Sequence, residues 1–241
     1  MTAALTTQGY VTDSEYTWGA YDAQSPARIA TVAATNGCAP PPLLEPFTYC
    51  DLGCGQGLTV SLLASVYPWA RFIGVDFNAR HIENARSFAA TAGLANVEFH
   101  CLGFEQALAA DLPALDYAAL HGVYTWVPQD VRAAILAFLQ AKLKPTGYAY
   151  VAYNTMPGWA ALQPLRELML IHASGVAGGS LDKAAEALDL LTTFAQAGAG
   201  YFARNPSAVQ SLNMLRSHDL SYVAHEYFNT AWEPIYFHRM A

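Results

Sequence analysis

Short apolar runs alternate with segments of helical periodicity from residue 47 to residue 153, and this alternation constrains the fold more than any other feature of the chain. Strands that alternate with helices at this spacing form a parallel sheet with helices on both faces. The pattern therefore predicts an α/β fold built on a doubly wound, mostly parallel sheet. The predicted strands are 47–52, 71–77, 97–102, 115–121 and 148–153.

The intervening segments carry signals for the ends of helices. Residues 58–67 place leucine and valine on one helical face, and Asn78 and Gly93 are suited to the start and the end of the next helix. Further helices are predicted over 128–145 and over 26–34, each with a proline in its first turn.

The alternation stops after the fifth strand, and three helices are predicted in its place: 158–173, 180–204 and 205–218. We expect the chain to have three parts, an N-terminal helical cap, a ligand-binding sheet domain and a helical region: 1–46, 47–157 and 158–241.

The charge of the chain argues against a nucleic-acid partner. Lysine and arginine number 12 against 19 acidic residues, for a net charge of −7, and no basic run occurs. Hydrophobic residues make up 54% of the chain and charged residues only 13%, which excludes intrinsic disorder. So few charges also lead us to expect that part of the surface is apolar and meets a partner, a second subunit or a further segment of chain.

Targeting and metal-binding signals are missing from the sequence. The start of the chain has neither the basic nor the apolar region of a signal peptide, and no apolar run is long enough to span a membrane. The cysteines show neither a CxxC pair nor histidines at metal-ligand spacing: Cys38, Cys50, Cys54 and Cys101. We expect free thiols in a cytoplasmic protein, no membrane span and no bound metal.

The most specific chemical signal is the segment DLGCGQG at Asp51–Gly57, between a predicted strand and a predicted helix. Glycines allow the positive φ angles of a tight turn and let the backbone approach a ligand. The N-terminus of the following helix offers free N–H groups to an anionic group. Three glycines at alternate positions after an acidic residue indicate ligand binding more strongly than a structural turn.

A second acidic residue, Asp76, ends the next predicted strand, 19 residues after Gly57. A carboxylate at this place can accept hydrogen bonds from both ribose hydroxyls of a nucleoside. The alternative is an exposed carboxylate that caps the following helix, and the nearby glycine turn favours the nucleoside.

The glycine spacing also bears on which nucleoside is bound. A dinucleotide fingerprint is GxGxxG and a Walker loop is GxxxxGK[ST], whereas this turn has GxGxG. The alternative to a dinucleotide or a nucleoside triphosphate is an adenosine cofactor that has an amino-acid tail and no phosphates. Asp51 would then face the ammonium group of the tail, and the glycine backbone its carboxylate.

The segments DLGCGQG and GVDFN resemble motif I and the acidic second-strand motif of class I S-adenosylmethionine (SAM)-dependent methyltransferases, over about residues 47–155. The resemblance implies a Rossmann-like fold, SAM as cofactor and S-adenosylhomocysteine (SAH) as product. The residues it implies are Gly53, Gly55 and Gly57 along the methionine part, Asp76 at the ribose, Phe77, Phe104 and Glu105 at the adenine, and His121 where cofactor and acceptor meet.

Further segments are similar to a narrower family, the bacterial methyltransferases that carry a methyltransferase regulatory domain. These segments are LHGVYTWV at 120–127, YNTMPGW at 153–159 and HEYFN at 225–229, with Tyr21 and the Ser25-Pro26 pair. Some members are protein-lysine methyltransferases that act on outer-membrane proteins. The resemblance therefore implies a substrate-recognition or regulatory role for the helical region.

The sequence departs from the class I pattern after the fifth strand. Class I sheets usually have seven strands, and a helix lies between the fifth strand and the last two strands. Here a helical block follows the fifth strand, and Trp232–Phe237 resembles the start of that last helix. We expect those two strands to be missing and the chain to be a fragment that begins a longer domain.

Methyl transfer requires an aligned acceptor, and it requires a base only where the acceptor must lose a proton. The candidates are His121, because histidine has a pKa of about 6.5, and three side chains that can orient an amine: Tyr124, Tyr153 and Asn154. A packing or turn role, or for His121 a cofactor contact, is the alternative for each of the four.

Two further pairs are weaker candidates. His225 and Glu226 lie on a predicted helix and are candidates for a lid or an acceptor site, and Tyr16 and Tyr21 for a cover over the cofactor. Ordinary packing is the alternative for all of them. The helical region is expected to form a lid or a homodimer surface.

Two functional hypotheses follow. The first is a SAM-dependent methyltransferase that acts on a protein lysine or a small molecule. The second is a regulatory module that binds SAM or SAH without catalysis. Methyl transfer from labelled SAM separates the two, whereas an NAD-dependent oxidoreductase, a third and remote alternative, would bind NADH instead.

Overall fold

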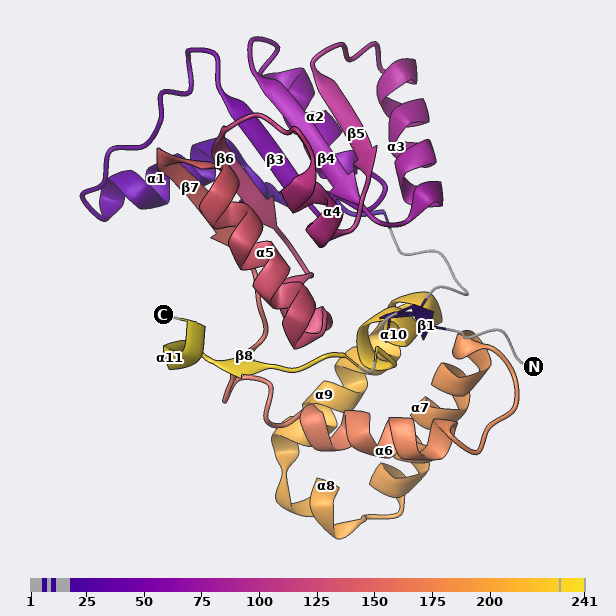
Figure 1. Cartoon of the computed structure of the whole chain (residues 1–241). Coiled ribbons are helices and arrows are strands. Elements are labelled where there is room, and N and C mark those ends of the chain that lie inside the picture. Colours follow the sequence, from indigo (N-terminus) through magenta and orange to yellow (C-terminus); the bar gives the residue numbers. More distant parts are fainter. Residues whose placement is uncertain (1–5, 8–9, 12–17, 230, 241) are drawn as a thin grey trace. The chain divides into compact units, whose positions relative to one another are not determined.

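The computed structural model describes four stretches of the chain, 6–7, 10–11, 18–229 and 231–240, and the chain divides into two compact units. The first, which we call the sheet unit, comprises 18–124 and 129–152. The second, the helical unit, comprises 125–128, the residues from 153 onward and the described residues before 18. Figure 1 shows the elements of both units.

The sheet unit contains, within the described residues, one sheet of five strands that all pair in parallel. The chain runs from β3 outward to β5, and then returns to the other side of β3 and continues to β7. The order therefore reverses at β3, and ligands of open α/β sheets bind at such a switch point, beyond the carboxyl ends of the strands. The strands in spatial order are β5 (Val97–Cys101), β4 (Arg71–Asp76), β3 (Thr48–Leu52), β6 (Leu115–Leu120) and β7 (Leu143–Val151).

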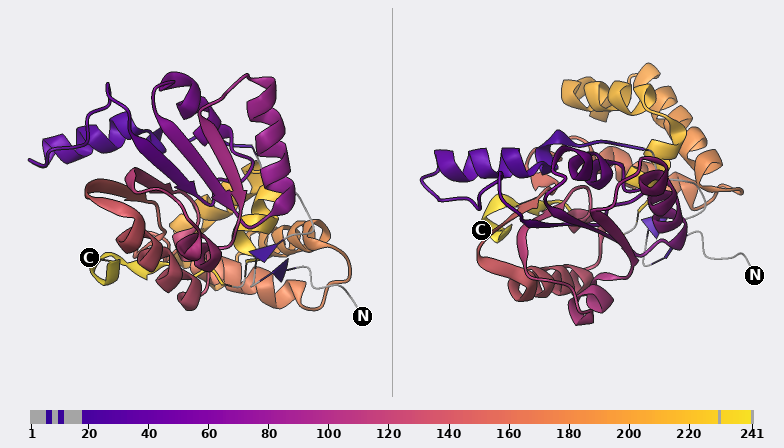
Figure 2. Two further views of the ribbon diagram at one scale, coloured as in Figure 1. Left: turned by 45° about the horizontal axis from the view of Figure 1, so that its top comes forward. Right: turned by 90° about the horizontal axis from the view of Figure 1, so that it is seen from above.

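Helices cover both faces of this sheet, as Figure 2 shows. One face carries α1 (Pro26–Thr35), α2 (Leu58–Val66) and α3 (Ala79–Thr91), and the other carries α4 (Phe104–Ala109) and α5 (Gln129–Lys142). The predicted α/β fold with a doubly wound parallel sheet is therefore confirmed. The predicted N-cap of α3 is also present, because the side-chain oxygen of Asn78 accepts a hydrogen bond from the N–H of Arg80.

A cluster rich in aromatic rings joins the sheet to α1, α2 and α3. Successive side chains of a strand point to opposite faces. Tyr49 of β3, Phe72 of β4, and Tyr117 and Ala119 of β6 all enter this cluster. Phe47 lies edge-on to the rings of Phe72 and Tyr117, with centroids 5.9 and 5.5 Å apart. The cluster therefore holds the three central strands to the helices on one face.

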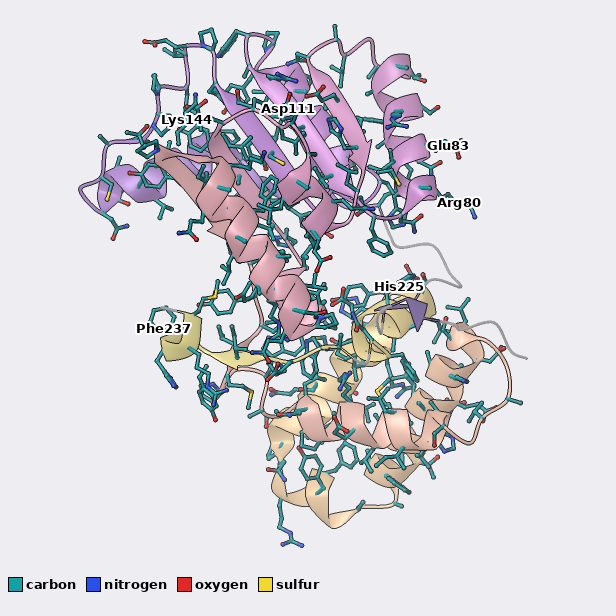
Figure 3. All side chains as sticks on the ribbon, in the orientation of Figure 1. Arg80, Glu83, Asp111, Lys144, His225 and Phe237 are labelled. Carbon is teal, nitrogen blue, oxygen red and sulfur yellow. The ribbon has the colours of Figure 1, made fainter. Side chains whose placement is uncertain are left out.

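A buried carboxylate joins three strands at their amino ends, away from the switch point. Asp116 of β6 is 8% exposed, and its Oδ2 accepts a hydrogen bond from the N–H of Thr48 at 2.8 Å. Lys144 of β7, labelled in Figure 3, places its Nζ 2.9 and 2.8 Å from the two oxygens. Hydrogen bonds with a charged partner are stronger than neutral ones, so this contact stabilises the sheet.

The helical unit has a hydrophobic core of its own, formed by five helices within the described residues. Leu165, Met169, Leu191, Leu215 and Val223 come from four of these helices and are fully buried there. The five helices are α6 (Gln163–Ala173), α7 (Ser180–Gln196), α8 (Gly200–Arg204), α9 (Pro206–Ser217) and α10 (Leu220–Tyr227).

Two short strand pairs also belong to the helical unit. β1 (Thr6–Thr7) pairs with β2 (Tyr10–Val11) in antiparallel fashion, and β8 (Thr155–Met156) pairs in parallel with β9 (Ile235–Tyr236). α11 (Phe237–Met240) follows β9 directly. None of the helices that the structure describes combines the length and apolar character that crossing a membrane requires.

The structure corrects several predicted elements. The helix predicted over 180–204 is two helices, because Gly198 adopts a left-handed φ of 68° just after α7. The helix predicted from residue 158 begins only at Gln163, after a series of turns, and the strand predicted from 148 begins at Leu143. α4 was not predicted, since six residues are too few to show a helical period.

Two further expectations concern the start of the last helix and the boundaries between domains. Residues 232–237 were expected to open a helix, but they contain β9, and α11 begins only at Phe237. By contacts, residues 18–46 group with the sheet and residues 153–157 with the helices. The domain boundaries expected from sequence at 46 and 157 divide the chain by function, and they stay predictions.

We expect Asp116→Ala to lower the free energy of unfolding by about 2–3 kcal/mol. The change removes a charged hydrogen-bond acceptor and leaves the Thr48 N–H without its partner. Urea unfolding followed by circular dichroism measures the loss. Asp111→Ala is the control, because Asp111 is an exposed aspartate (Figure 3), and it should change stability by less than about 0.5 kcal/mol. Equal losses in the two variants would contradict this role of Asp116.

Candidate functional site

The turn between β3 and α2 has the backbone geometry that its glycines predict. Gly53, Gly55 and Gly57 adopt φ angles of 79°, 52° and 74°. The N–H groups of Gly53 and Cys54 both donate to the carbonyl oxygen of Val75 on β4, at 2.7 and 3.0 Å. The turn is therefore fixed to the neighbouring strand at the point where α2 begins.

The three glycines serve different purposes. A Cβ on Gly57 would lie 2.6 Å from the Cβ of Ala85, and a Cβ on Gly53 would lie 2.5 Å from Cγ2 of Val123. Glycine at these two positions therefore permits close packing. A Cβ on Gly55 would meet no atom of the described residues within 4 Å. Gly55 is thus the position in the turn where a ligand can approach the backbone.

Asp51, at the carboxyl end of β3, is 2% exposed. Burial raises the pKa of its carboxyl group to about 7, because an ion is poorly solvated there; the hydrogen bond from Gln24 opposes this rise and the charge of Asp76 adds to it. A carboxyl group with this pKa is ready to ionise next to a cationic ligand group.

Gln24 is a site residue that the sequence did not reveal. Its Nε2 donates to Asp51 Oδ1 at 3.1 Å, and its carbonyl oxygen accepts a hydrogen bond from the hydroxyl of Tyr49 at 3.1 Å. The amide side chain is buried, and Gln24 is the last residue of η1 (Asp22–Gln24), a short 3₁₀ helix before α1. A lone glutamine 27 residues before its partner carries no recognisable pattern.

Asp76, at the end of β4, connects the turn to the start of α3. Its Oδ2 accepts from the N–H of Gly55 at 3.0 Å, and its Oδ1 accepts from the N–H of Asn78 at 2.8 Å. His81 Nδ1 lies 3.5 Å from the same Oδ1. A carboxylate offers about four acceptor positions, so these contacts leave capacity for ribose hydroxyls.

The side chains expected around an adenine follow the two outer strands on this side of the sheet. Phe77 comes directly after β4 and is 46% exposed. Phe104, half-buried, and Glu105, exposed, form the first turn of α4, which follows β5. Because Asp76 pairs with Cys101 at the ends of these strands, the two segments leave the same edge of the sheet.

His121, directly after β6, lies among tyrosines. The ring of Tyr21 stacks on it with a centroid distance of 4.0 Å and an interplanar angle of 23°. Its Nδ1 lies 3.3 Å from the hydroxyl oxygen of Tyr150 on β7. Burial lowers the pKa of His121, so the imidazole is neutral at neutral pH.

Tyr21 is part of a segment that the structure holds against the switch point. Its N–H donates to Thr59 Oγ1 in the first turn of α2 at 3.2 Å, and the Thr59 hydroxyl in turn donates to the carbonyl oxygen of Gly19 at 3.4 Å. With the Gln24–Asp51 contact, residues 19–24 are attached to β3, α2 and the residue after β6. The companion candidate, Tyr16, lies outside the described residues.

The remaining catalytic candidates are divided between the two units. Tyr124 is the last residue of its stretch of the sheet unit, is 7% exposed and begins the 3₁₀ turn η2 (Tyr124–Trp126). Tyr153 and Asn154 follow β7 and belong to the helical unit, where both are half-buried.

Asn154 is the centre of a hydrogen-bond network in the helical unit. Its Oδ1 accepts from the hydroxyl of Thr125 at 2.8 Å and from Nε1 of Trp232 at 3.2 Å, and its own N–H donates to the Thr125 oxygen at 3.1 Å. A carbonyl oxygen has two lone pairs, so Oδ1 is saturated. Any contact of the Asn154 side chain with an acceptor must therefore use its Nδ2 group.

Asn229, the last residue of the segment HEYFN at 225–229, also belongs to this network. Its side-chain Nδ2 donates to the carbonyl oxygen of Trp126 at 2.9 Å. Its main-chain carbonyl oxygen accepts a hydrogen bond from the guanidinium group of Arg166. That guanidinium lies 4.7 Å from the ring centroid of Trp232. Thr125 and Trp126, Asn154, and Asn229, which come from three segments distant in sequence, therefore meet in one network of the helical unit.

His225 and Glu226, the candidates for a lid, lie on α10. His225 is 3% exposed, whereas Glu226 is half-buried, and α10 packs against α7 (Figure 3). In the part of the chain that the structure describes, no three histidine, cysteine, aspartate or glutamate residues lie close enough to hold a metal ion. All four cysteines are described, and all are free thiols.

Comparisons with known proteins agree on the family. Residues 45–172 match the family model of a methyltransferase domain. An uncharacterised protein of Synechocystis sp. is 40% identical over 234 residues, which cover 97% of this chain and 46% of that protein. An uncharacterised protein of Rickettsia prowazekii is 32% identical over 221 residues, which cover 89% of this chain and 85% of that protein.

A solved structure is similar over almost the whole chain. PKMT2 from Rickettsia typhi, in complex with AdoHcy, has a TM-score of 0.81 and 30% sequence identity, covering 93% of this chain and 43% of that one. The chain thus spans less than half the length of PKMT2 and of the Synechocystis relative.

We expect alanine to have different effects at two of the glycines. Gly55→Ala should lower the free energy of unfolding by about 1–2 kcal/mol, the usual disadvantage of a left-handed backbone for a residue with Cβ. Gly57→Ala should lower it by about 1–3 kcal/mol more, because its Cβ would overlap Ala85 and Phe99. Urea unfolding measures both, and a more stable Gly57→Ala than Gly55→Ala would contradict the packing role of Gly57.

Proposed function

The chain belongs to the family of methyltransferase domains, and from this premise we propose that it binds SAM and transfers the methyl group to an acceptor, releasing SAH. The observation that carries the proposal is the open backbone at Gly55, beside the buried carboxylates of Asp51 and Asp76, at the switch point of the sheet. The AdoHcy complex of PKMT2 supports the same ligand here.

The residues of the sheet unit fit the parts of this ligand. The Asp51 carboxyl group, once ionised, complements the ammonium group of the amino-acid tail, and the backbone at Gly55 permits close approach. Asp76 has acceptor capacity for the ribose hydroxyls. The exposed ring of Phe77, with Phe104 and Glu105, supplies surface for the adenine.

The chemistry that SAM supplies is a methyl group on a sulfonium, with a neutral thioether as leaving group. The tasks of the protein are to align the acceptor, exclude water and accept a proton where the acceptor carries one. We propose His121 for the proton, since its ring is neutral at neutral pH. Tyr124, Tyr153 and the Nδ2 group of Asn154 are proposed to orient the acceptor.

The acceptor is proposed to be a protein lysine or a small molecule. The net charge of −7 disfavours nucleic acid, which binds through neutralisation of its phosphates. The helical unit is proposed to recognise the acceptor or to regulate the site, as the resemblance to the family with a regulatory domain implies. If no methyl transfer from labelled SAM occurs over a broad acceptor panel, a non-catalytic SAM- or SAH-binding module becomes the better interpretation.

Location and assembly follow as finer proposals. Four free thiols support a reducing compartment, and we propose the cytoplasm. A homodimer through the helical unit is proposed because α6 and α7 expose large apolar side chains: Ile171, Leu181 and Phe194. Size-exclusion chromatography with light scattering tests the assembly directly.

We expect this chain to bind SAH with micromolar affinity, and Asp76→Asn to weaken binding by about tenfold or more. Each lost hydrogen bond to a charged acceptor is worth about 1.5–3 kcal/mol. Titration calorimetry measures the affinities, and thermal unfolding tests whether the turn is still folded. Glu83→Gln is the control, because Glu83 is an exposed residue of α3 (Figure 3).

Each result of this titration has a clear meaning. Equal affinity in the wild type and the folded Asp76→Asn variant would contradict the assigned ribose contact. Binding of NADH in place of SAH would contradict the proposed function altogether. If the wild type binds neither nucleotide, the same titration on the full-length gene product decides whether more of the protein is needed.

We also expect the affinity for SAH to rise with pH up to about 7. The free protein holds a proton on Asp51 below that pH, and an ammonium group placed beside the carboxylate displaces it, so affinity should rise about tenfold per pH unit. It should level off above pH 7, where the Asp51 carboxyl group of the free protein is already ionised. Calorimetry from pH 5 to pH 8 tests this, and Asp51→Asn should remove the dependence. If the affinity of the wild type does not change between pH 5 and pH 8, the pairing of Asp51 with the ammonium group is contradicted.

A further inference from the structure

We propose that Tyr150 is a positioning residue of the methyl-transfer site, which holds the imidazole of His121 as the Nδ1–H tautomer and leaves Nε2 free to accept a proton. The inference rests on the proposed function, because a base is needed only where an acceptor must be deprotonated. Nothing in the sequence distinguishes Tyr150 from Tyr148, the other tyrosine of its strand.

The strand register brings the two side chains together. Tyr150 of β7 pairs with Ala119 of β6, and His121 follows Ala119 by two residues. Residues two apart in an extended chain share a face, so Tyr150 and His121 project from the same face as diagonal neighbours. Nδ1 of the imidazole and the Tyr150 hydroxyl oxygen are 3.3 Å apart, and the rings are inclined by only 10°.

The ring has little freedom to adopt another orientation. Tyr21 stacks on it at 4.0 Å, and Tyr21 is itself fixed to α2 by the hydrogen bond to Thr59. Since Nδ1 is engaged with Tyr150, Nε2 is the ring nitrogen that remains for a ligand. The direction of the proton between Nδ1 and the hydroxyl then decides whether Nε2 is a donor or an acceptor.

The Tyr150 hydroxyl can serve as the acceptor of this hydrogen bond. Burial and the carboxylate of Asp22 raise the pKa of Tyr150, and Arg28 opposes them, so the hydroxyl keeps its proton. Asp22 and Arg28 form an exposed ion pair 3.0 Å apart, so their charges largely cancel at the hydroxyl. A phenol oxygen that keeps its proton still has a lone pair that can accept a hydrogen bond from Nδ1–H. Tyr49, on β3, which β6 separates from β7, is a neutral phenol, since burial raises its pKa.

The same contact assists the proton transfer itself. When an ammonium acceptor gives its proton to Nε2, both ring nitrogens carry protons and the ring is positively charged. The hydrogen bond from Nδ1–H to the Tyr150 oxygen then becomes charge-assisted and stronger. Tyr150 thus raises the proton affinity of a ring whose pKa burial lowers.

The test is the tautomer of His121, read from two-bond ¹H–¹⁵N spectra of protein labelled in its histidines, with His121→Gln to assign the signals. We expect the wild type to show protonated Nδ1 and unprotonated Nε2 above the pKa. Tyr150→Phe, which keeps the ring, should lose this pattern and lower the titration midpoint of His121 by about one pH unit.

Tyr148→Phe is the matched control. Tyr148 lies two residues before Tyr150 on the same strand, and its hydroxyl donates to the carbonyl oxygen of Ala39 at 3.4 Å instead. It should leave the His121 spectrum unchanged.

A wild-type ring protonated on Nε2 overturns the inference even if no variant folds. A spectrum that Tyr150→Phe does not change, or that both variants change alike, also overturns it. SAH titrations run in parallel separate the two levels. Whether the wild type binds SAH bears on the proposed function, whereas an unaltered tautomer in Tyr150→Phe contradicts only the role of Tyr150.

Discussion

The candidate site depends on the hydrogen bonds that hold the turn after β3 against the end of β4. The carbonyl oxygen of Val75 accepts from Gly53 and Cys54, and the next residue, Asp76, accepts from Gly55 through its side chain. A turn with three positive φ angles cannot satisfy its N–H groups by a regular ladder, and buried N–H groups need partners. One strand end therefore shapes the turn and also presents the carboxylate assigned to the ribose.

Features encoded by neighbouring residues could be predicted from the sequence. The glycine turn and the carboxylate at the next strand end are local patterns, and the strand–helix alternation predicted a parallel sheet with helices on both faces. Gln24 and Tyr150 could not be found in this way, because their partners lie 27 and 29 residues away along the chain. A tyrosine in a strand and a glutamine before a helix are ordinary residues until the fold places them beside Asp51 and His121.

The helical part shows a different limit of sequence reasoning. Gly198 divides α7 from α8, yet glycine in an alanine-rich segment does not show whether a helix ends or continues. The segments that resemble the family supply catalytic candidates in the sequence analysis, but several of their side chains form hydrogen bonds with one another. Asn154 and Thr125 are joined in both directions, and Trp232 donates to the same Asn154 oxygen. The resemblance locates important residues without separating those that react from those that hold the structure.

The division of the chain into units bears on what each assay measures. The groups assigned to SAM, from Asp51 to Glu105, all belong to the sheet unit, as does His121. Tyr153 and Asn154 belong to the helical unit, and the chain passes between the units directly after Tyr124 and directly before Tyr153. On these assignments, cofactor binding tests residues proposed in the sheet unit, and methyl transfer also tests the proposed roles of Tyr153 and Asn154. A chain that binds SAH but transfers no methyl group over a broad acceptor panel would have an intact cofactor-binding turn, and this result would favour the non-catalytic binding module.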